Sequence, residues 1–306
     1  GDEISQELQL LGNTDRFSWT VGLYYANDAQ DALFQRWQYE ETTPRPRSDV
    51  TYTKRTDNAI FGEGTYRITD KWSLTAGLRY TEEKFKNAVF NSARPRPAYG
   101  QVLQEVDRGS AIGVENRAKF DAVTPRVSIQ YAWDDAVMTY LTYSEGFNSG
   151  GVNGGALING QFISYSGERL KQYELGFRSD LFNRTLRFNA NVFKGYWEDI
   201  QIGEVIVPGQ ITTRNGGAAE IQGLEIDLLW QATGELVLNL SGGFLDTKYT
   251  DLGTTTTIRL NSEFAYAPSR SYSAGASYQW PLTSGAAIRL RGDYGWIGDH
   301  VTVNDI

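Results

Sequence analysis

A strict alternation of apolar and polar side chains is the feature that most constrains this chain. From Lys71 to Thr81 (KWSLTAGLRYT), every even position is apolar or aromatic, and every odd position is polar or glycine. Successive side chains of a β-strand point to opposite faces, so this segment predicts a strand with one apolar and one polar face. The same period recurs along the chain, and we expect an all-β fold. Further examples lie at 17–25, 173–181, 224–230 and 288–296.

Two kinds of connection separate the expected strands. Short polar turns are expected at Gly12–Arg16, Thr69–Asp70, Trp133–Asp135, Asn183–Arg184, Thr233–Gly234 and Thr283–Gly285. Longer loops rich in Gly, Pro, Asn and Thr are expected at Thr42–Asp49, roughly 91–110, Asn148–Ser166, Val207–Thr213 and Asp251–Asn261. This asymmetry is typical of an antiparallel transmembrane β-barrel with short periplasmic turns and long extracellular loops. Counting between these landmarks gives about twelve strands, each long enough for the ~9–11 residues that cross a bilayer.

Hydropathy and aromatic content agree with a barrel. The mean hydropathy is −0.44, and the sequence contains no apolar stretch near the ~20 residues of a membrane helix. Barrel strands are polar on average because they alternate. Aromatic residues lie beside the short turns, where a barrel has an aromatic belt at the membrane interface. These residues are Trp19, Trp72, Trp133, Phe182, Trp230 and Trp280.

The polar faces carry charges of both signs, whereas the apolar faces are nearly free of charge. Because an Arg or Lys at the bilayer midplane costs about 2–4 kcal/mol, we expect the charged faces to border an enclosed lumen. A soluble sandwich would instead expose them to bulk water, but its strands are usually only about five or six residues long. The expected lumen residues are Arg79, Arg126, Glu174, Arg178, Asp180, Arg187, Glu225, Asp227, Arg289, Arg291 and Asp293.

Composition excludes several functional classes. A net charge of −8 argues against a nucleic-acid partner. The chain has no cysteine and only one histidine, His300, so we expect no metal site and no cofactor. Glu82–Glu83 and Glu198–Asp199 are adjacent pairs whose members face opposite sides of a strand, which prevents paired acid–base chemistry. We therefore expect no enzymatic activity.

Several segments together resemble TonB-dependent outer-membrane receptors. The resemblance covers most of the chain, and the order and spacing of its pieces make it specific. It starts with SQELQL (5–10) and WTVGLYY (19–25) and continues with AIFGEGTYRITDKWSLTAGLRY (59–80), TPRVSIQ (124–130) and YSEGFNSGGVN (143–153). It ends with LKQYELGFRSD (170–180), LRFNANVFKGYWEDI (186–200) and QGLEID (222–227).

The resemblance implies a bacterial outer-membrane barrel of 22 strands with a plug inside it, and a TonB-type partner that supplies energy. We expect residues 1–306 to be an internal part of that barrel, about 12 of 22 strands, with the N-terminal plug and the closing strands outside this chain. The resemblance implies import of a scarce large solute, most simply an iron–siderophore complex. A passive porin-like channel, an outer-membrane enzyme and a soluble β-sandwich remain as alternatives.

One loop is the expected ligand-binding region. FNSGGVNGG (147–155) follows a strand, and glycine lets the backbone approach a ligand closely. An ordinary loop tip is the alternative. Tyr196, Trp197 and Trp296, together with the Tyr165 of this region, could stack on a ligand or form an upper aromatic belt. The candidate ligand-binding residues are Phe147, Asn148, Gly150, Gly151, Asn153 and Tyr165.

Overall fold

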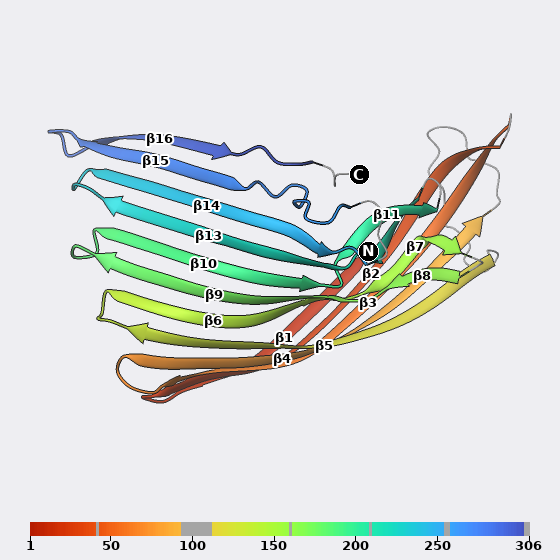
Figure 1. Ribbon diagram of the computed structural model, residues 1–306, viewed down its shortest axis with the longest axis horizontal. Helices are drawn as coiled ribbons and strands as arrows, with labels where there is room; N and C mark the ends of the chain where they lie inside the picture. The colour runs from red at the N-terminus through yellow and green to blue at the C-terminus, as the bar shows by residue number, and fades with distance from the viewer. Residues whose placement is uncertain (41–42, 93–111, 159–160, 208–209, 254–257, 303–306) are drawn as a thin grey trace.

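A computed structural model describes residues 1–40, 43–92, 112–158, 161–207, 210–253 and 258–302. Twelve strands form one antiparallel sheet in the order β1-β2-β3-β4-β5-β6-β9-β10-β13-β14-β15-β16 (Figure 1). The expected all-β class and the count of about twelve strands are confirmed. The strands are β1 (Asp2–Asn13), β2 (Phe17–Glu40), β3 (Thr43–Arg67), β4 (Trp72–Ser92), β5 (Ile112–Ala132), β6 (Val137–Asn148), β9 (Glu168–Leu181), β10 (Leu186–Glu198), β13 (Ala218–Gln231), β14 (Leu236–Asp251), β15 (Arg270–Pro281) and β16 (Ala287–Ile297).

The short turns predicted from the sequence join consecutive strands at one end of the sheet, on the left in Figure 1. In the β1–β2 turn, the Thr14 hydroxyl accepts from the Phe17 amide at 3.1 Å. In the β9–β10 turn, Phe182, Asn183 and Arg184 all have positive φ. Local side-chain bonding and left-handed backbone therefore make these connections tight.

The expected loop at Thr42–Asp49 is wrong for the part that the structure describes. β3 begins at Thr43, and residues 43–49 pair with β2 in a long hairpin. Within the described residues β4 pairs with β3 as far as Ser48, so no described residue of β4 lies opposite Pro44 or Pro46, which have no N–H to donate. The expected loop at about 91–110 lies almost entirely outside the described residues.

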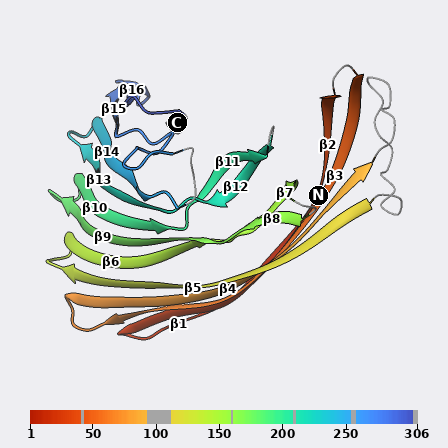
Figure 2. The same ribbon diagram turned by 45° about the vertical axis from the view of Figure 1, so that its right-hand side comes forward.

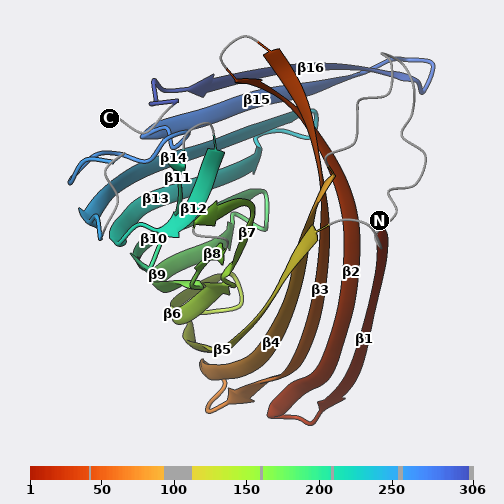
Figure 3. The same ribbon diagram turned by 90° about the vertical axis from the view of Figure 1, so that its right-hand side faces the viewer.

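The expected loop Asn148–Ser166 contains a hairpin, and the expected loop Val207–Thr213 is wrong in that residues 210–213 belong to a strand of a second hairpin. β7 (Gly151–Ile158) pairs with β8 (Gln161–Tyr165), and β11 (Gln201–Val207) pairs with β12 (Gln210–Asn215). Both hairpins lie at the long-loop end of the sheet (Figure 3). The polar, glycine-rich composition suggested irregular loops, but the Ile, Val and Thr residues in β11 and β12 favour paired strands.

The sheet curves into an open trough (Figures 2 and 3). β1 and β16 are its two edges, and within the described residues no pairing joins them. Among the described residues, the structure has no helix with the length and apolar character to cross a membrane. The sheet has two faces of opposite character, and these faces position the candidate sites.

Candidate functional site

The strand register joins the apolar positions into one continuous face. A single row of paired residues runs Ile129–Leu141–Leu175–Val192–Leu224 across five strands. Four of the five side chains in this row are exposed, from 38% at Ile129 to 54% at Leu175, and Leu224 is partly exposed. Such an apolar surface in water would be very unfavourable, so this face requires an apolar environment.

The apolar face has a constant height. In β4 it extends from Trp72 to Tyr80, and in β14 from Leu236 to Phe244, before charged residues begin. Nine residues span about 27 Å along a strand. At the usual tilt this gives roughly 20 Å along the membrane normal, near the ~25 Å apolar band of outer-membrane barrels. We call these outward positions the apolar band.

The predicted interface aromatics lie on or next to the apolar band at its turn end. Trp72 and Tyr131 rings are 4.7 Å apart, and Tyr131 contacts Trp133 edge-on at 4.8 Å. Trp133 and Phe182 are 56% and 72% exposed. The strand register places Trp19, Trp230 and Trp280 at the same end of the sheet, next to the short turns. The arrangement suits a membrane interface, where amphipathic rings lie at the headgroup level.

The opposite face is polar and hollowed. A hollow of about 690 Å³ is bordered by Tyr140, Arg178 and Asn189. A second, of about 760 Å³, is bordered by Asp227 and Ser241, among others. Both lie on the concave side of the trough. The register places all eleven of the charges expected to line a lumen on this face.

These inward charges have local partners. Arg187 donates to Asp180 at 2.9 Å. Arg291 pairs with Asp293 at 2.7 Å. The guanidinium of Arg79 lies 5.5 Å from the centre of the Phe61 ring. The concave face is therefore a polar wall of mixed sign, without one dominant charge.

The remaining inward charges follow the same pattern. Arg126 pairs with Glu63 at 3.3 Å. Tyr140 donates to Glu174 at 2.6 Å, and Arg178 lies over the Tyr140 ring at 5.3 Å. Two further contacts involve these charges: Asn191 donates to Glu225 at 3.2 Å, and Arg289 donates to Gln279 at 3.2 Å. Asp227 borders the second hollow.

The candidate ligand-binding loop is connected to the β11–β12 hairpin. The side-chain Nδ2 of Asn153 donates to the backbone carbonyl of Thr213 at 2.8 Å, and the side-chain Oδ1 of Asn153 accepts from the backbone amide of Thr213 at 2.7 Å. This two-point contact imitates one rung of a β-ladder. It holds β7 and β12 together although the two strands are about sixty residues apart in sequence.

A second network lies at the base of both hairpins. Gln201 donates from its side chain to the Ser149 carbonyl at 2.7 Å, and its backbone amide donates to Glu168 at 2.7 Å. Asn148 also donates to Glu168, at 3.0 Å. Asn215 accepts from the Ser166 amide at 2.7 Å. Sequence reasoning missed Gln201, Glu168 and Asn215, because only the fold brings these segments together.

Glycine and aromatic residues pack closely in the same region. A Cβ on Gly151 would lie 2.4 Å from the Tyr165 hydroxyl, and one on Gly150 would lie 2.3 Å from the Tyr165 carbonyl oxygen. Phe147 lies over Gly167 in the same way. Burial raises the pKa of Tyr165, so its hydroxyl stays protonated at neutral pH. The six candidate residues thus gather at the mouth of the trough, where their packing and hydrogen bonds stabilise the loops.

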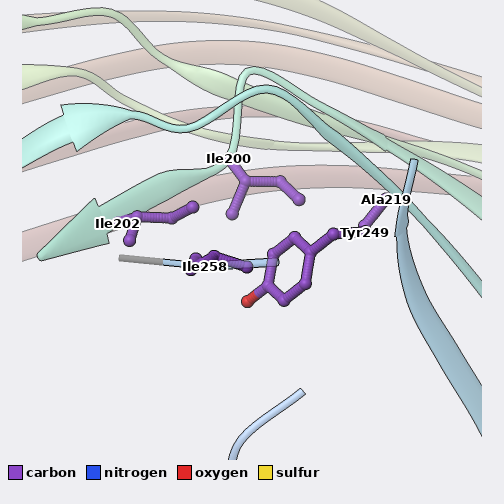
Figure 4. Close-up of a cluster of buried hydrophobic side chains, with 5 residues drawn as sticks. All are labelled: Ile200, Ile202, Ala219, Tyr249 and Ile258. Carbon is purple, nitrogen blue, oxygen red and sulfur yellow. The ribbon is translucent and has the colours of Figure 1, made fainter. Parts of the chain in front are cut away.

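A hydrophobic cluster fixes the base of β11 on the neighbouring strands (Figure 4). Ile200, Ile202, Ala219, Tyr249 and Ile258 are buried together. Trp197 and Phe264 pack against this cluster with their rings 5.7 Å apart. Trp197 is therefore part of the packing at the mouth.

Two further aromatic residues of the mouth lie on the convex side of the sheet. Tyr196 and Trp296 lie on the convex side by register. Trp296 stacks on Tyr272 with ring centres 5.0 Å apart. Their positions favour an upper aromatic belt over contact with a ligand inside the trough.

The predicted separation is observed for Glu82 and Glu83, whereas Asp199 follows the end of β10 and has a positive φ, so the second pair does not lie within one strand. Glu82 faces the convex side and pairs with Lys84 at 2.7 Å. Glu83 faces the concave side, is buried, and pairs with Arg55 at 3.0 Å. In the part of the chain that the structure describes, no group of three or more His, Asp or Glu side chains could hold a metal ion.

Comparison with known proteins identifies the family. The TonB dependent receptor-like β-barrel family model matches residues 2–305. The chain belongs to this family. Such barrels are outer-membrane proteins of Gram-negative bacteria, and the family comprises transport receptors rather than enzymes. This membership confirms three predictions: the all-β membrane fold, the location in the bacterial outer membrane, and a transport receptor rather than an enzyme.

Individual relatives are distant. The pesticin receptor of Yersinia enterocolitica (serotype O:8 / biotype 1B) is 23% identical over 248 residues, which cover 80% of this chain and 34% of that receptor. The chain thus spans about a third of the length of the curated relatives it matches.

Solved structures share the fold. The ferric yersiniabactin uptake receptor FyuA from Yersinia pestis superposes with a TM-score of 0.79 at 19% identity, over 97% of this chain and 43% of that one. The siderophore receptor PiuA from Acinetobacter baumannii gives 0.69 at 15% identity, over 99% and 47%. The open trough therefore matches a part of larger closed barrels.

Proposed function

We propose that this chain forms part of the barrel wall of an active-transport receptor. The receptor would bind a scarce large solute at the long-loop mouth and import it with energy from a TonB-type partner. The observation that carries this proposal is the concave polar wall of mixed charge, in a sheet whose two edges are open. A barrel that is completed by further strands and filled by a plug would cover both features.

The inward charges then have a specific role in the proposal. They contact a plug domain of the same polypeptide, which lies outside this chain. Arg187–Asp180 and Arg291–Asp293 border the concave side, where charges of both signs can exchange partners with a polar plug surface. The six loop residues at the mouth contribute to binding of the solute.

An iron–siderophore complex is the proposed solute. Two of the similar solved structures support this choice, because one is a ferric yersiniabactin uptake receptor and the other is a siderophore receptor. Half-buried aromatic residues at the mouth, such as Tyr165, suit a bulky solute.

Uptake by intact cells tests the proposal. Cells that carry the full-length gene, and cells that lack it, are grown in iron-limited and in carbon-limited medium, and uptake of ferric siderophores is measured. The proposal predicts a growth defect in iron-limited medium only, and uptake that stops when the inner-membrane proton gradient is collapsed. A passive porin-like channel, the alternative, would keep its flux without the gradient.

A further inference from the structure

Arg79 on the concave face carries a positive charge that no carboxylate neutralises within the part of the chain that the structure describes. Its side chain contacts two aromatic rings and one hydroxyl there, and no carboxylate oxygen lies at ion-pair distance. Glu63, on the strand beside it, pairs with Arg126 at 3.3 Å. Glu83, on its own strand, is buried and pairs with Arg55 at 3.0 Å. These neighbouring carboxylates already have cationic partners, so the charge of Arg79 stays without an ion pair.

Two aromatic rings hold the guanidinium of Arg79 in place. Its central carbon lies over the Tyr24 ring at 5.4 Å and over the Phe61 ring at 5.5 Å. Phe61 fills the space above Gly22 on the neighbouring strand, where a Cβ would lie 2.3 Å from the ring. The face of an aromatic ring attracts a guanidinium group, and all three side chains are half-buried. The position of the cation is therefore fixed by packing across β2, β3 and β4.

The outer end of this guanidinium is available to a ligand. The Nε of Arg79 donates to the Thr81 hydroxyl at 3.1 Å, and among the described residues no oxygen accepts from its Nη atoms. The Nε hydrogen bond and the two rings fix the plane of the guanidinium. Parallel N–H groups in a fixed plane match the two oxygens of a carboxylate, which they bind with two hydrogen bonds.

Arg79 lies at the mouth end of the concave wall. It precedes Tyr80, the last residue of the apolar band on β4. Its partner on β5 is Thr124, and four residues further along β5 Phe120 reaches the mouth loop, where a Cβ on Gly150 would lie 2.5 Å from the Phe120 ring. Four residues of a strand span about 13 Å. A large solute held by the mouth loops can reach Arg79 across this distance.

Other inward arginines without an ion pair lie at the opposite end of the wall. Among the described side chains of the twelve-stranded sheet, they are Arg67, Arg178 and Arg289. Each of them lies within four residues of a short turn, whereas Arg79 lies seven residues beyond Trp72, where β4 begins. The position of Arg79 near the mouth therefore distinguishes it from the other arginines of this group.

We propose that Arg79 binds a carboxylate of the transported solute, just below the mouth loops. This inference rests on the transport function proposed above, and it adds a charged group to the description of the solute. The rings of Tyr24 and Phe61 shield the guanidinium partly from water, which strengthens a charge-assisted hydrogen bond. A neutral solute would leave the cation without a partner, so the site discriminates between solutes by charge. In this proposal Arg79 serves the solute rather than the plug.

Binding to the full-length receptor tests the proposal. A panel of ferric siderophores is used, and it contains complexes with free carboxylates, such as ferric aerobactin, and neutral complexes without them, such as ferrichrome. Binding is measured with purified receptor, and uptake is measured with cells. The variant Arg79→Gln should weaken binding of the carboxylate-bearing complexes by about tenfold to a hundredfold, and it should leave binding of neutral complexes unchanged. Arg79→Lys keeps the charge but loses the fork, so it should restore only part of the affinity.

The convex face supplies a matched control. Lys194 pairs with Glu220 at 3.2 Å on that face, and Lys194→Gln removes one positive charge far from the concave wall. This variant should bind every complex like the unchanged receptor. The proposal is overturned if all complexes that bind lack a free carboxylate. It is also overturned if Arg79→Gln weakens carboxylate-bearing and neutral complexes equally, since Arg79 would then act on the plug or on the wall. Uptake of no complex at all would refute the transport function itself, and this inference with it.

Discussion

An arginine in the middle of the apolar band should destabilise the protein in a membrane. Leu240 is the central outward residue of β14, four residues from each end of the band, and it is 44% exposed. Four residues correspond to about 13 Å along the strand, or roughly 10 Å of depth at the usual tilt. Leu240→Arg therefore places its charge near the bilayer midplane, at a cost of about 2–4 kcal/mol.

The preceding residue gives the control for this substitution. Asn239 faces the concave side, and its amide approaches the Asp293 carboxylate across Gly275, where a Cβ would lie within 2.6 Å of both. An arginine at Asn239 can therefore pair with Asp293. We expect Asn239→Arg to change the free energy of unfolding by less than about 1 kcal/mol.

The assay is reversible urea unfolding of the full-length protein in phospholipid bilayers, followed by tryptophan fluorescence and by migration on a gel without heating. A cost of 2–4 kcal/mol lowers the folding equilibrium constant about thirtyfold to a thousandfold. Equal destabilisation by the substitutions at Leu240 and at Asn239, or a larger effect at Asn239, would refute the assignment of the two faces.

Three further outcomes are expected. Gly176→Val should destabilise the protein by about 1–3 kcal/mol, because a Cβ at Gly176 would lie 2.1 Å from the Tyr140 ring, whereas Gly292→Ala, which has open space, should be neutral in the same urea assay. Asn153→Ala removes both bonds to Thr213 and should speed amide exchange in the β7–β8 hairpin, whereas unchanged exchange would show that these bonds do not hold it. Residues 1–306 alone should not form a stable sheet in a bilayer, since the unpaired backbone groups on β1 and β16 each cost several kcal/mol; a compact, heat-modifiable gel band would contradict this.

The main features of the fold could be predicted because they depend on local patterns. Alternation in segments such as Lys71–Thr81 fixed the strands and their two faces. Each short turn was recognisable from a few polar residues, as at Asn183–Arg184. These signals are local, and the bilayer strengthens them because it rejects charge on one face.

The mouth of the trough was harder to predict because its contacts join distant segments. Gln201 and Asn215 carry no local signal of their roles, and the hairpins they support come from different loops. The faces on which Tyr196 and Trp197 lie became clear from the register of β10 with β13. The candidate ligand-binding residues lie at the mouth, and their role in binding stays a prediction.

The upper edge of the membrane surface was also missed. On β4 the residues Glu82 and Lys84 read as ordinary polar strand positions, and only the pairing with Lys119 shows that they form part of a charged belt. A single strand cannot show whether its charges balance those of its neighbours.

The orientation of the two faces can be measured directly on β13. The chain has no cysteine, so single cysteines from position 224 to position 229 can each carry a spin label without interference from other thiols within this chain. In bilayers, the labels at even positions should collide with oxygen dissolved in the lipid, and those at odd positions should be shielded from it. Alternation in the opposite phase, or equal oxygen access at all six positions, would contradict a lipid-facing apolar band.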